Sequence, residues 1–254
     1  MTALVPQKVA SLIVQEVNEY ITIAERHMLE DDPKYLDWLN RIEAMNVPEL
    51  AGLRAYTYAL VASVRGDVYD FERSIADARR GDVERSDILV LQLIGYANLS
   101  YATKASSAFQ QHVDIKNGNL QGHLNIGACI GSFQRVSELM VQAKRANLDL
   151  RWGAIEEWAR ASAILADRNC SDEECAKLLD VVGEVLRPRS LFWLDAHPKV
   201  LPDEEQGTVL LRFRVAVSPD EAATMSGEYV QKLVEAGLDD SPLMVNFVGV
   251  KFAS

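Results

Sequence analysis

The sequence is poor in residues that form disulfides or bind metals. It has three cysteines, Cys129, Cys170 and Cys175, no Cys-x-x-Cys pair, and four histidines in 254 residues. An odd number of cysteines without paired spacing argues against a disulfide-based secreted fold and is typical of a reducing compartment, where thiols serve mainly as core residues. Cys170 and Cys175 are five residues apart, and this spacing does not place two side chains on one face of a helix.

The chain also lacks targeting and membrane segments. No apolar run approaches the roughly 18 residues that a membrane-spanning helix needs. Near the N-terminus, Pro6, Glu16 and Glu19 interrupt the apolar stretch that a cleaved signal requires. We therefore expect a cytoplasmic protein.

Catalytic motifs are missing as well. The sequence has no HExxH, no GxSxG, no Walker lysine loop and no GxGxxG after a strand. The chain is therefore predicted not to be an enzyme and to use no cofactor. His112 and His123 lie across a predicted turn and can meet on facing helices near Cys129. A metal site needs converging ligands, and because this spacing does not demand one, no metal site is predicted.

The charge is strongly acidic and unevenly spread. The net charge is −11, from 26 basic and 37 acidic side chains. Residues 1–50 and 201–254 each carry 4 basic and 9 acidic side chains, which leaves residues 51–200 almost balanced. Repulsion from phosphates disfavours nucleic acid and anionic membrane surfaces as partners. The same charge favours a basic partner protein, although an acidic surface that only faces solvent is the simpler explanation.

Most of the chain has a helical pattern. Apolar residues recur at three- and four-residue steps from Lys8 to Leu186, which predicts ten amphipathic helices in five antiparallel pairs. The boundaries have recognisable signals. Asp31-Asp32-Pro33 is typical of a helix start, Arg79-Arg80-Gly81 of a helix end, and Ser171-Asp172-Glu173-Glu174 of a capping box.

The pattern changes at Arg187-Pro188-Arg189. Thr208 to Val217 alternates like a strand, a helix capped at Ser218 follows, and Leu243 to Phe252 is typical of a second strand. This order predicts a right-handed parallel crossover. Two strands alone are marginal, so we expect the segment around Leu191, or another chain, to complete the sheet. The predicted domains are therefore a helical one, 1–187, and a small α/β one, 188–254.

Three phrases inside the helical part are similar to one another. They are Gly66-Asp67-Val68-Tyr69, Asn98-Leu99-Ser100-Tyr101 and Ile130-Gly131-Ser132-Phe133, with aromatics 32 residues apart. We interpret these aromatics as packing residues between helices. The 66–80 segment, with Gly66-Asp67 and the ladder Tyr69, Phe71, Ile75 and Ala78, resembles the turn and second helix of a tetratricopeptide repeat. The resemblance covers about 53–146. Because the Trp-Leu-Gly-Tyr signature of the first helix is absent, an irregular helical bundle is the alternative fold.

The resemblance implies a mainly α fold, an antiparallel helix-pair superhelix of about ten helices with a small C-terminal β-α-β domain. In this family the concave face is lined by first helices and receives peptides or partner helices. The helical register projects five candidate partner-binding residues there: Tyr56, Ser63, Tyr96, Gln121 and Asn125. Tyr56 and Tyr96, each taken alone, are also explained as core residues.

These observations predict a non-enzymatic protein-binding module of adaptor, chaperone or toxin-neutralising immunity type, which engages a partner protein through the helical array. Two alternatives stay open. One is a structural homo-oligomer assembled through the C-terminal strand. The other is an enzyme with an unrecognised site near His112 and His123.

Overall fold

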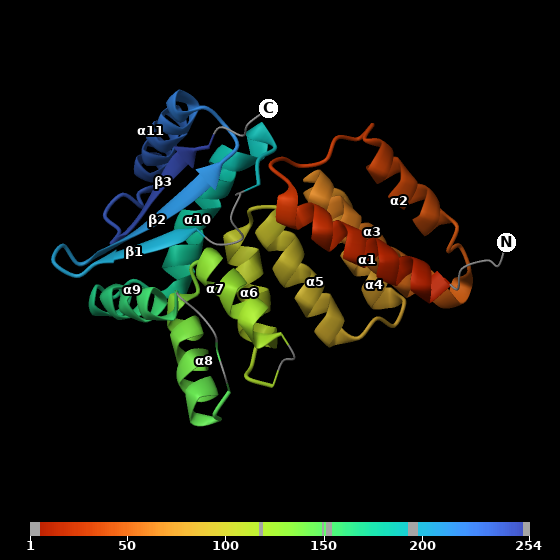
Figure 1. Ribbon diagram of the computed structural model, residues 1–254, viewed down its shortest axis with the longest axis horizontal. Helices are drawn as coiled ribbons and strands as arrows, with labels where there is room; N and C mark the ends of the chain where they lie inside the picture. Colours follow the sequence, from red (N-terminus) through yellow and green to blue (C-terminus); the bar gives the residue numbers. More distant parts are fainter. Residues whose placement is uncertain (1–5, 117–118, 149, 151–153, 193–197, 251–254) are drawn as a thin grey trace.

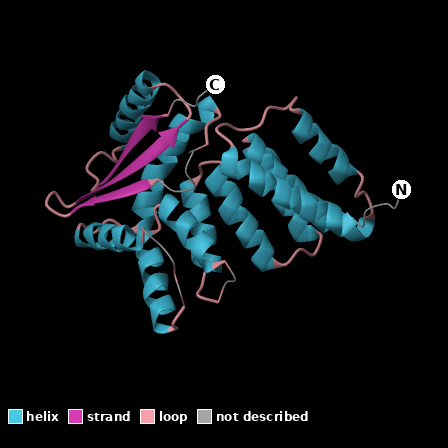
Figure 2. Ribbon diagram, in the orientation of Figure 1, coloured by secondary structure: helices cyan, strands magenta, loops and turns pink. Residues whose placement is uncertain are grey.

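The computed structural model describes residues 6–116, 119–148, 150, 154–192 and 198–250. Helices fill most of it, and a small sheet lies near the C-terminal end (Figures 1 and 2). The prediction of a mainly helical chain followed by a C-terminal β-α-β unit is confirmed. Within the described part of the chain, no helix is both long and apolar enough to cross a bilayer.

Ten α-helices precede residue 187 in these described ranges, as the apolar periodicity predicts. They are α1 (Pro6–Ile23), α2 (Pro33–Glu43), α3 (Ala51–Arg65), α4 (Val68–Arg80), α5 (Arg85–Asn98), α6 (Ala102–His112), α7 (Leu120–Cys129), α8 (Phe133–Arg145), α9 (Ile155–Asp167) and α10 (Asp172–Leu186). Short 3-10 turns, η1 (Pro48–Leu50) and η2 (Arg187–Arg189), precede α3 and follow α10. The helices α3 and α4, and likewise α5 and α6, pack as antiparallel neighbours, and α3, α5 and α7 lie side by side.

Several helices end in the same backbone turn. A residue with positive φ follows the helix, and the next N–H donates to the carbonyl five positions earlier, which satisfies an otherwise free carbonyl. After α3, Gly66 has φ 83° and the N–H of Asp67 donates to the Ala62 carbonyl at 3.1 Å. Ser100 and Gly131 occupy the equivalent position after α5 and α7, with bonds of 2.8 and 2.9 Å.

These turns do not follow the 32-residue interval between the aromatics. The equivalent turn residues are Gly66, Ser100 and Gly131, so the spacing is 34 residues (66 to 100) and then 31 (100 to 131). The aromatics therefore occupy different positions in the three units. Phe133 is fully buried, but Tyr69 is 73% exposed and its ring lies beside the Arg73 guanidinium at the surface. The interpretation of all three aromatics as packing between helices is wrong for Tyr69.

The helices α3 and α4 approach until their backbones touch. Gly52 near the start of α3 lies against Gly81 at the end of α4, and a Cβ on Gly52 would overlap the Gly81 carbonyl oxygen. Glycine is required on both sides of this contact because any side chain would force the helices apart.

Helix α10 joins the helical array to the sheet. Its Asp180 carboxylate accepts the Thr103 N–H of α6 at 3.2 Å, and Asp172 accepts the N–H groups of Gln134 and Arg135 of α8 at 2.8 and 3.0 Å. The helix also packs against the C-terminal helix beside the sheet (Figure 1). The buried apolar side chains consequently form one continuous cluster from α1 to the last strand.

The sheet has three strands in the order β1 (Lys199–Asp203), β2 (Thr208–Val215) and β3 (Leu243–Gly249). Helix α11 (Pro219–Ala236) connects β2 to β3, which run parallel as predicted. Alternate residues of β2 face the core, and the Phe213 and Tyr229 rings both lie against Phe247, with centroids 6.1 and 6.4 Å away. Ser218 caps α11, and Gly237 ends it with φ 66°.

The third strand comes from a segment that the sequence reasoning left unassigned. Lys199–Asp203 pairs antiparallel with β2, with Lys199 opposite Arg212. The turn between the strands is closed by the Gln206 N–H, which donates to the Asp203 carboxylate at 3.0 Å, and by Gly207 with φ 64°. The expectation that the Leu191 segment or another chain supplies this strand is therefore wrong. Leu191 makes only an isolated bridge with Arg26.

That bridge belongs to a contact between the segment after α1 and the segment after α10. The N–H of His27 donates to the Ser190 carbonyl at 2.8 Å, and its buried ring lies between Gly66 and Phe192. Nδ1 of His27 lies 3.1 Å from the Val64 carbonyl, so a neutral ring with the proton on Nδ1 donates to it. Burial lowers the pKa of His27 from its ordinary 6.5 to about 4.

We expect Gly52→Ala to lower the free energy of unfolding by about 2–3 kcal/mol, because the new methyl group pushes α4 away from α3. Gly227→Ala on α11 is the matched control. A Cβ there meets no atom within 4 Å, so that change should stabilise the protein by about 0.5–1 kcal/mol through helix propensity. Urea unfolding at pH 7 measures both, and equal effects of the two changes would refute the close contact.

We expect the stability that depends on His27 to fall as the pH decreases from 7 to 4. Above pH 6.5 the ring is neutral in both states and contributes no pH dependence. Below 6.5 the unfolded chain binds a proton that the folded protein does not accept until about pH 4, so unfolding is favoured by about 3 kcal/mol. His27→Gln keeps a donor but does not titrate. The stability advantage of the wild type over this variant should shrink by that amount, and a constant difference would contradict the assignment.

Candidate functional site

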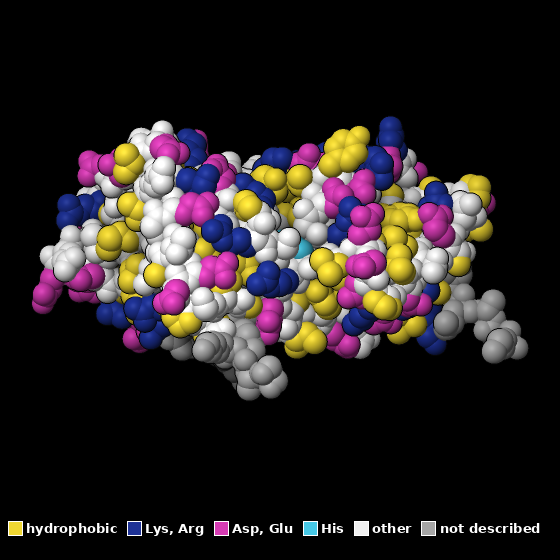
Figure 3. All heavy atoms as spheres, turned by 90° about the horizontal axis from the view of Figure 1, so that it is seen from above, with side chains coloured by type: hydrophobic (Ala, Val, Ile, Leu, Met, Phe, Trp, Pro, Cys, Tyr) yellow, Lys and Arg dark blue, Asp and Glu magenta, His cyan; other side chains and the backbone are white. Residues whose placement is uncertain are grey.

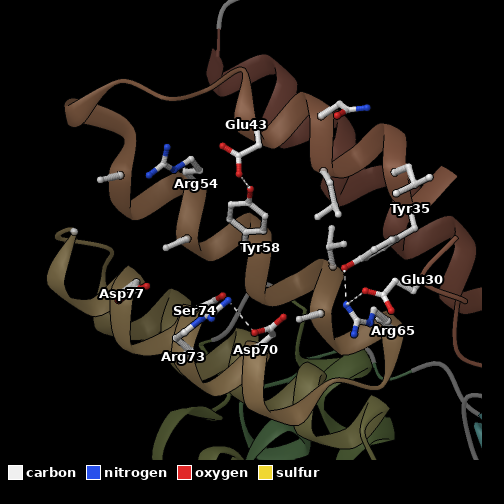
Figure 4. Close-up of a pocket in the computed structure, with 18 of the residues that line it drawn as sticks. Glu30, Tyr35, Glu43, Arg54, Tyr58, Arg65, Asp70, Arg73, Ser74 and Asp77 are labelled. Carbon is white, nitrogen blue, oxygen red and sulfur yellow. Dashed lines mark hydrogen bonds and ion pairs between the residues drawn. The ribbon is translucent and has the colours of Figure 1, made fainter. Parts of the chain in front are cut away.

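A groove of about 870 Å³ lies between α2, α3 and α4 (Figure 4). Helix α3 forms its floor, and α2 and α4 form its two walls. Figure 3 shows basic, acidic and apolar side chains interspersed on one face of the molecule, so the net charge is not gathered there into one acidic patch. We therefore take the groove, and not a charged patch, as the candidate site.

Local sequence places each of these elements. The Asp32 side chain accepts the Lys34 N–H, and Pro33 occupies the first position of α2. Asp67 caps α4 in the same way, by accepting the Asp70 N–H at 2.9 Å. The contact of Gly52 with Gly81 holds α4 tightly on α3, whereas α2 rests on α3 through side chains. The space between the walls stays open as a result.

One stripe of α3 faces the groove. It consists of Ala51, Arg54, Ala55, Tyr58, Val61, Ala62 and Arg65, which share one face at three- and four-residue steps. Figure 4 shows Tyr58 pointing toward Glu43 of α2, and the two are hydrogen-bonded. Burial and this bond raise the pKa of the Tyr58 hydroxyl, so the tyrosine is a neutral donor at physiological pH.

The charges in the groove are balanced and mostly paired with one another. The lining contains four arginines and four acids: Arg54, Arg65, Arg73 and Arg80 with Glu30, Glu43, Asp70 and Asp77. Arg73 pairs with Asp70 at 2.8 Å, and Arg65 lies 3.8 Å from Glu30 and donates to the Tyr35 hydroxyl at 3.2 Å. Because the positive and negative side chains are equal in number, the groove has no net charge to attract a small anion or cation. It suits a ligand that itself carries both signs.

Apolar side chains are available between these charges. Leu36 of α2 is 45% exposed, and Leu39 is partly buried one turn further along. Both line the groove. Leu36 and Leu39 therefore give the α2 wall an apolar contact surface between the charged groups.

The five predicted partner-binding residues do not form one open surface. Ser63 is fully buried and donates to the Leu60 carbonyl, and Tyr96 is buried with its ring on Phe71 and its hydroxyl 3.2 Å from Glu72. Tyr56 is half-buried. For Tyr96, the explanation as a core residue fits its burial.

Gln121 is exposed and Asn125 is half-buried, and both lie on α7. Tyr56 and Ser63 lie on the opposite side of α3 from the groove stripe. The sequence reasoning missed Arg54, Tyr58 and Arg65. Their spacing along α3 was the available signal, but a second apolar stripe on the same helix concealed it.

The chemically reactive residues lie elsewhere. His112 and His123 do meet, with ring centroids 5.6 Å apart. Within the described ranges, however, no three or more histidine, cysteine, aspartate or glutamate side chains are grouped to hold a metal. Burial raises the pKa of the Cys129 thiol, which favours its neutral form. His197 lies outside the described residues.

Cys170 and Cys175 do not share one helix, so the helical spacing does not set the distance between them. Cys170 precedes α10 and Cys175 lies in its first turns, so the backbone brings their sulfurs to 3.6 Å.

A scan against protein-family models and searches of curated proteins and of solved structures return no match to this chain.

We expect Leu36→Ala to change the free energy of unfolding by less than about 1 kcal/mol, because the side chain is 45% exposed. Ile42→Ala on the same helix removes a side chain with no exposed surface and should cost about 2–4 kcal/mol. Urea unfolding compares the two. A large loss for Leu36→Ala would mean that this leucine serves the fold and is not free to contact a partner.

Proposed function

We propose that this chain is a non-enzymatic protein-binding module that receives an amphipathic helix of a partner protein in the groove between α2, α3 and α4. The observation that carries the proposal is the combination of an exposed leucine on the α2 wall with alternating, paired charges along the α4 wall. Helix-in-groove recognition uses apolar anchors at three- and four-residue steps, and the lining provides apolar contacts at that spacing.

The dimensions of the walls suit a short helix. The α2 wall is 11 residues long and the α4 wall 13, which at 1.5 Å per residue gives about 16–20 Å. A partner helix of about three turns fills that length. Leu36, Leu39 and Tyr58 provide the apolar contact, and burial of such side chains provides most of the affinity at an interface.

The charges set which helix fits. Along α4 the order is Asp70, Arg73, Asp77, Arg80, so a partner helix with charges in the complementary order gains favourable pairs and one with the same order is repelled. Exposed ion pairs contribute little to affinity, but they select register and partner. This favours a partner helix of mixed charge over the purely basic partner that the net charge suggests.

An adaptor, a chaperone or a toxin-neutralising immunity protein would each use such a groove. The adjacency of α3, α5 and α7, together with turns 34 and 31 residues apart, supports a tetratricopeptide-like array as the framework. In that case the groove lies between second helices of successive pairs, α2 and α4, and the predicted surface with Tyr56, Gln121 and Asn125 is a separate one. The proposed compartment is the cytoplasm.

Comparative capture tests the proposal. Equal amounts of the wild type, Leu36→Lys and the control Val230→Lys are immobilised and exposed to a lysate of the source cells. Val230 on α11 is 54% exposed and lies far from the groove (Figure 1). We expect at least one protein to bind the wild type and the control equally and to bind Leu36→Lys at least about tenfold more weakly, a loss of about 1.4 kcal/mol.

The other outcomes are equally informative. Equal capture by all three chains would contradict the groove, and no reproducible capture by any of them would contradict a protein-binding module. Recovery of this chain alone would favour the structural homo-oligomer. The edge of the sheet supports that second candidate. Among the described residues β3 pairs with a strand on one side only, and an unpaired strand edge can pair with a second copy of the chain.

A further inference from the structure

The two cysteines at the start of α10 form a close dithiol. Their sulfur atoms lie 3.6 Å apart. The third cysteine of the chain, Cys129, lies on α7. The turn that ends α9 produces this contact. Asn169 has φ 55°, the N–H of Cys170 donates to the Leu165 carbonyl at 2.8 Å, and the chain then enters α10 through the Ser171 cap.

Three parts of the molecule hold the pair in place. Gln134 of α8 donates to the Cys170 carbonyl at 3.1 Å, and Gly131 lies against the Cβ of Cys175. Ser241, in the segment that leads into β3, lies close enough to the Cys170 thiol to lower its pKa. The sulfurs are therefore fixed relative to each other in the folded protein, and an approach of about 1.5 Å brings them to disulfide bonding distance.

We propose that Cys170 and Cys175 are a redox modification site, a dithiol that hydrogen peroxide converts to an intrachain disulfide. The Cys170 thiolate attacks one peroxide oxygen, the O–O bond breaks, and the departing hydroxide takes a proton and leaves as water. The Cys175 thiol then attacks the Cys170 sulfenic acid, the S–S bond forms, and the S–O bond breaks to release a second water. Two thiols are oxidised while one peroxide is reduced to two waters.

The surroundings assign the order of the two steps. Hydrogen bonds from Cys175 and Ser241 lower the pKa of the Cys170 thiol against the opposing effect of burial. The bond to Cys170 and burial raise the pKa of the Cys175 thiol. Since the thiolate is the nucleophile, Cys170 reacts first and Cys175 resolves the sulfenic acid. Cys170 retains 6% exposure and Cys175 none, which gives the same order of access.

The sequence allows a direct readout. Trypsin cleaves after Arg168 and Lys177, so one peptide, 169–177, contains both cysteines and excludes Cys129. The reduced, native protein is treated with hydrogen peroxide, remaining thiols are blocked by alkylation under denaturing conditions, and the digest is analysed by mass spectrometry. A parallel sample is oxidised in urea. Cys129→Ser serves as the matched control and Cys175→Ser as the test of the resolving role.

We expect peptide 169–177 from the native wild type and from Cys129→Ser to lose two hydrogens and to resist alkylation until a reductant is added. Native Cys175→Ser should instead carry a sulfenic acid at Cys170 that dimedone traps. If the native protein leaves both thiols free while the urea-unfolded chain forms the disulfide, burial protects the pair, the sulfurs serve only as core packing, and the proposal is wrong. The wild-type comparison decides this even if the serine variant fails to fold.

Discussion

The fold depends on two carboxylates that α10 supplies to other helices. Tyr101 and Ser132 are the cap residues that precede α6 and α8, and their side chains make no capping bond. The first N–H groups of these helices donate instead to Asp180 and Asp172. Each cap of this kind contributes on the order of 1 kcal/mol to the stability of the protein. Its main effect here is to connect α10 to α6 and α8. Because α10 also packs on α11, these bonds fix the helical array to the sheet, and one continuous core results.

The groove exists because α4 and α2 pack at different distances from α3. On one side the glycine contact between Gly52 and Gly81 brings α4 to backbone distance. On the other side Tyr58 and its partner Glu43 stand between α3 and α2. The space between α2 and α4 stays open because its charged side chains pair with one another, and because Tyr58 and Tyr35 are hydrogen-bonded to Glu43 and Arg65. Under our proposal, a partner helix fills this space and brings its own apolar side chains to the exposed leucine.

Much of the local structure follows from the sequence. The caps at Asp32, Ser171 and Ser218, the helix end at Gly81 and the alternation of β2 are all predicted and all present. Each of these depends on hydrogen bonds or side-chain periodicity within a few residues. The 32-residue interval fails for a related reason. It aligns visible aromatics, whereas the turns after α3, α5 and α7 depend on positive φ at Gly66, Ser100 and Gly131, and serine is not a residue type that predicts positive φ.

The sequence by itself determined where several helices begin, that the chain is mainly helical, and that a parallel crossover follows the helices. It did not determine that the first helix ends at Ile23. Only the tertiary structure decided which surfaces meet. It placed Lys199–Asp203 beside β2, turned Arg54 and Tyr58 toward α2 while burying Ser63 and Tyr96, and brought the sulfurs of Cys170 and Cys175 together. Local hydrogen bonds are fixed by near neighbours, but α3 has two usable apolar stripes, and the choice between them depends on the packing of the whole molecule.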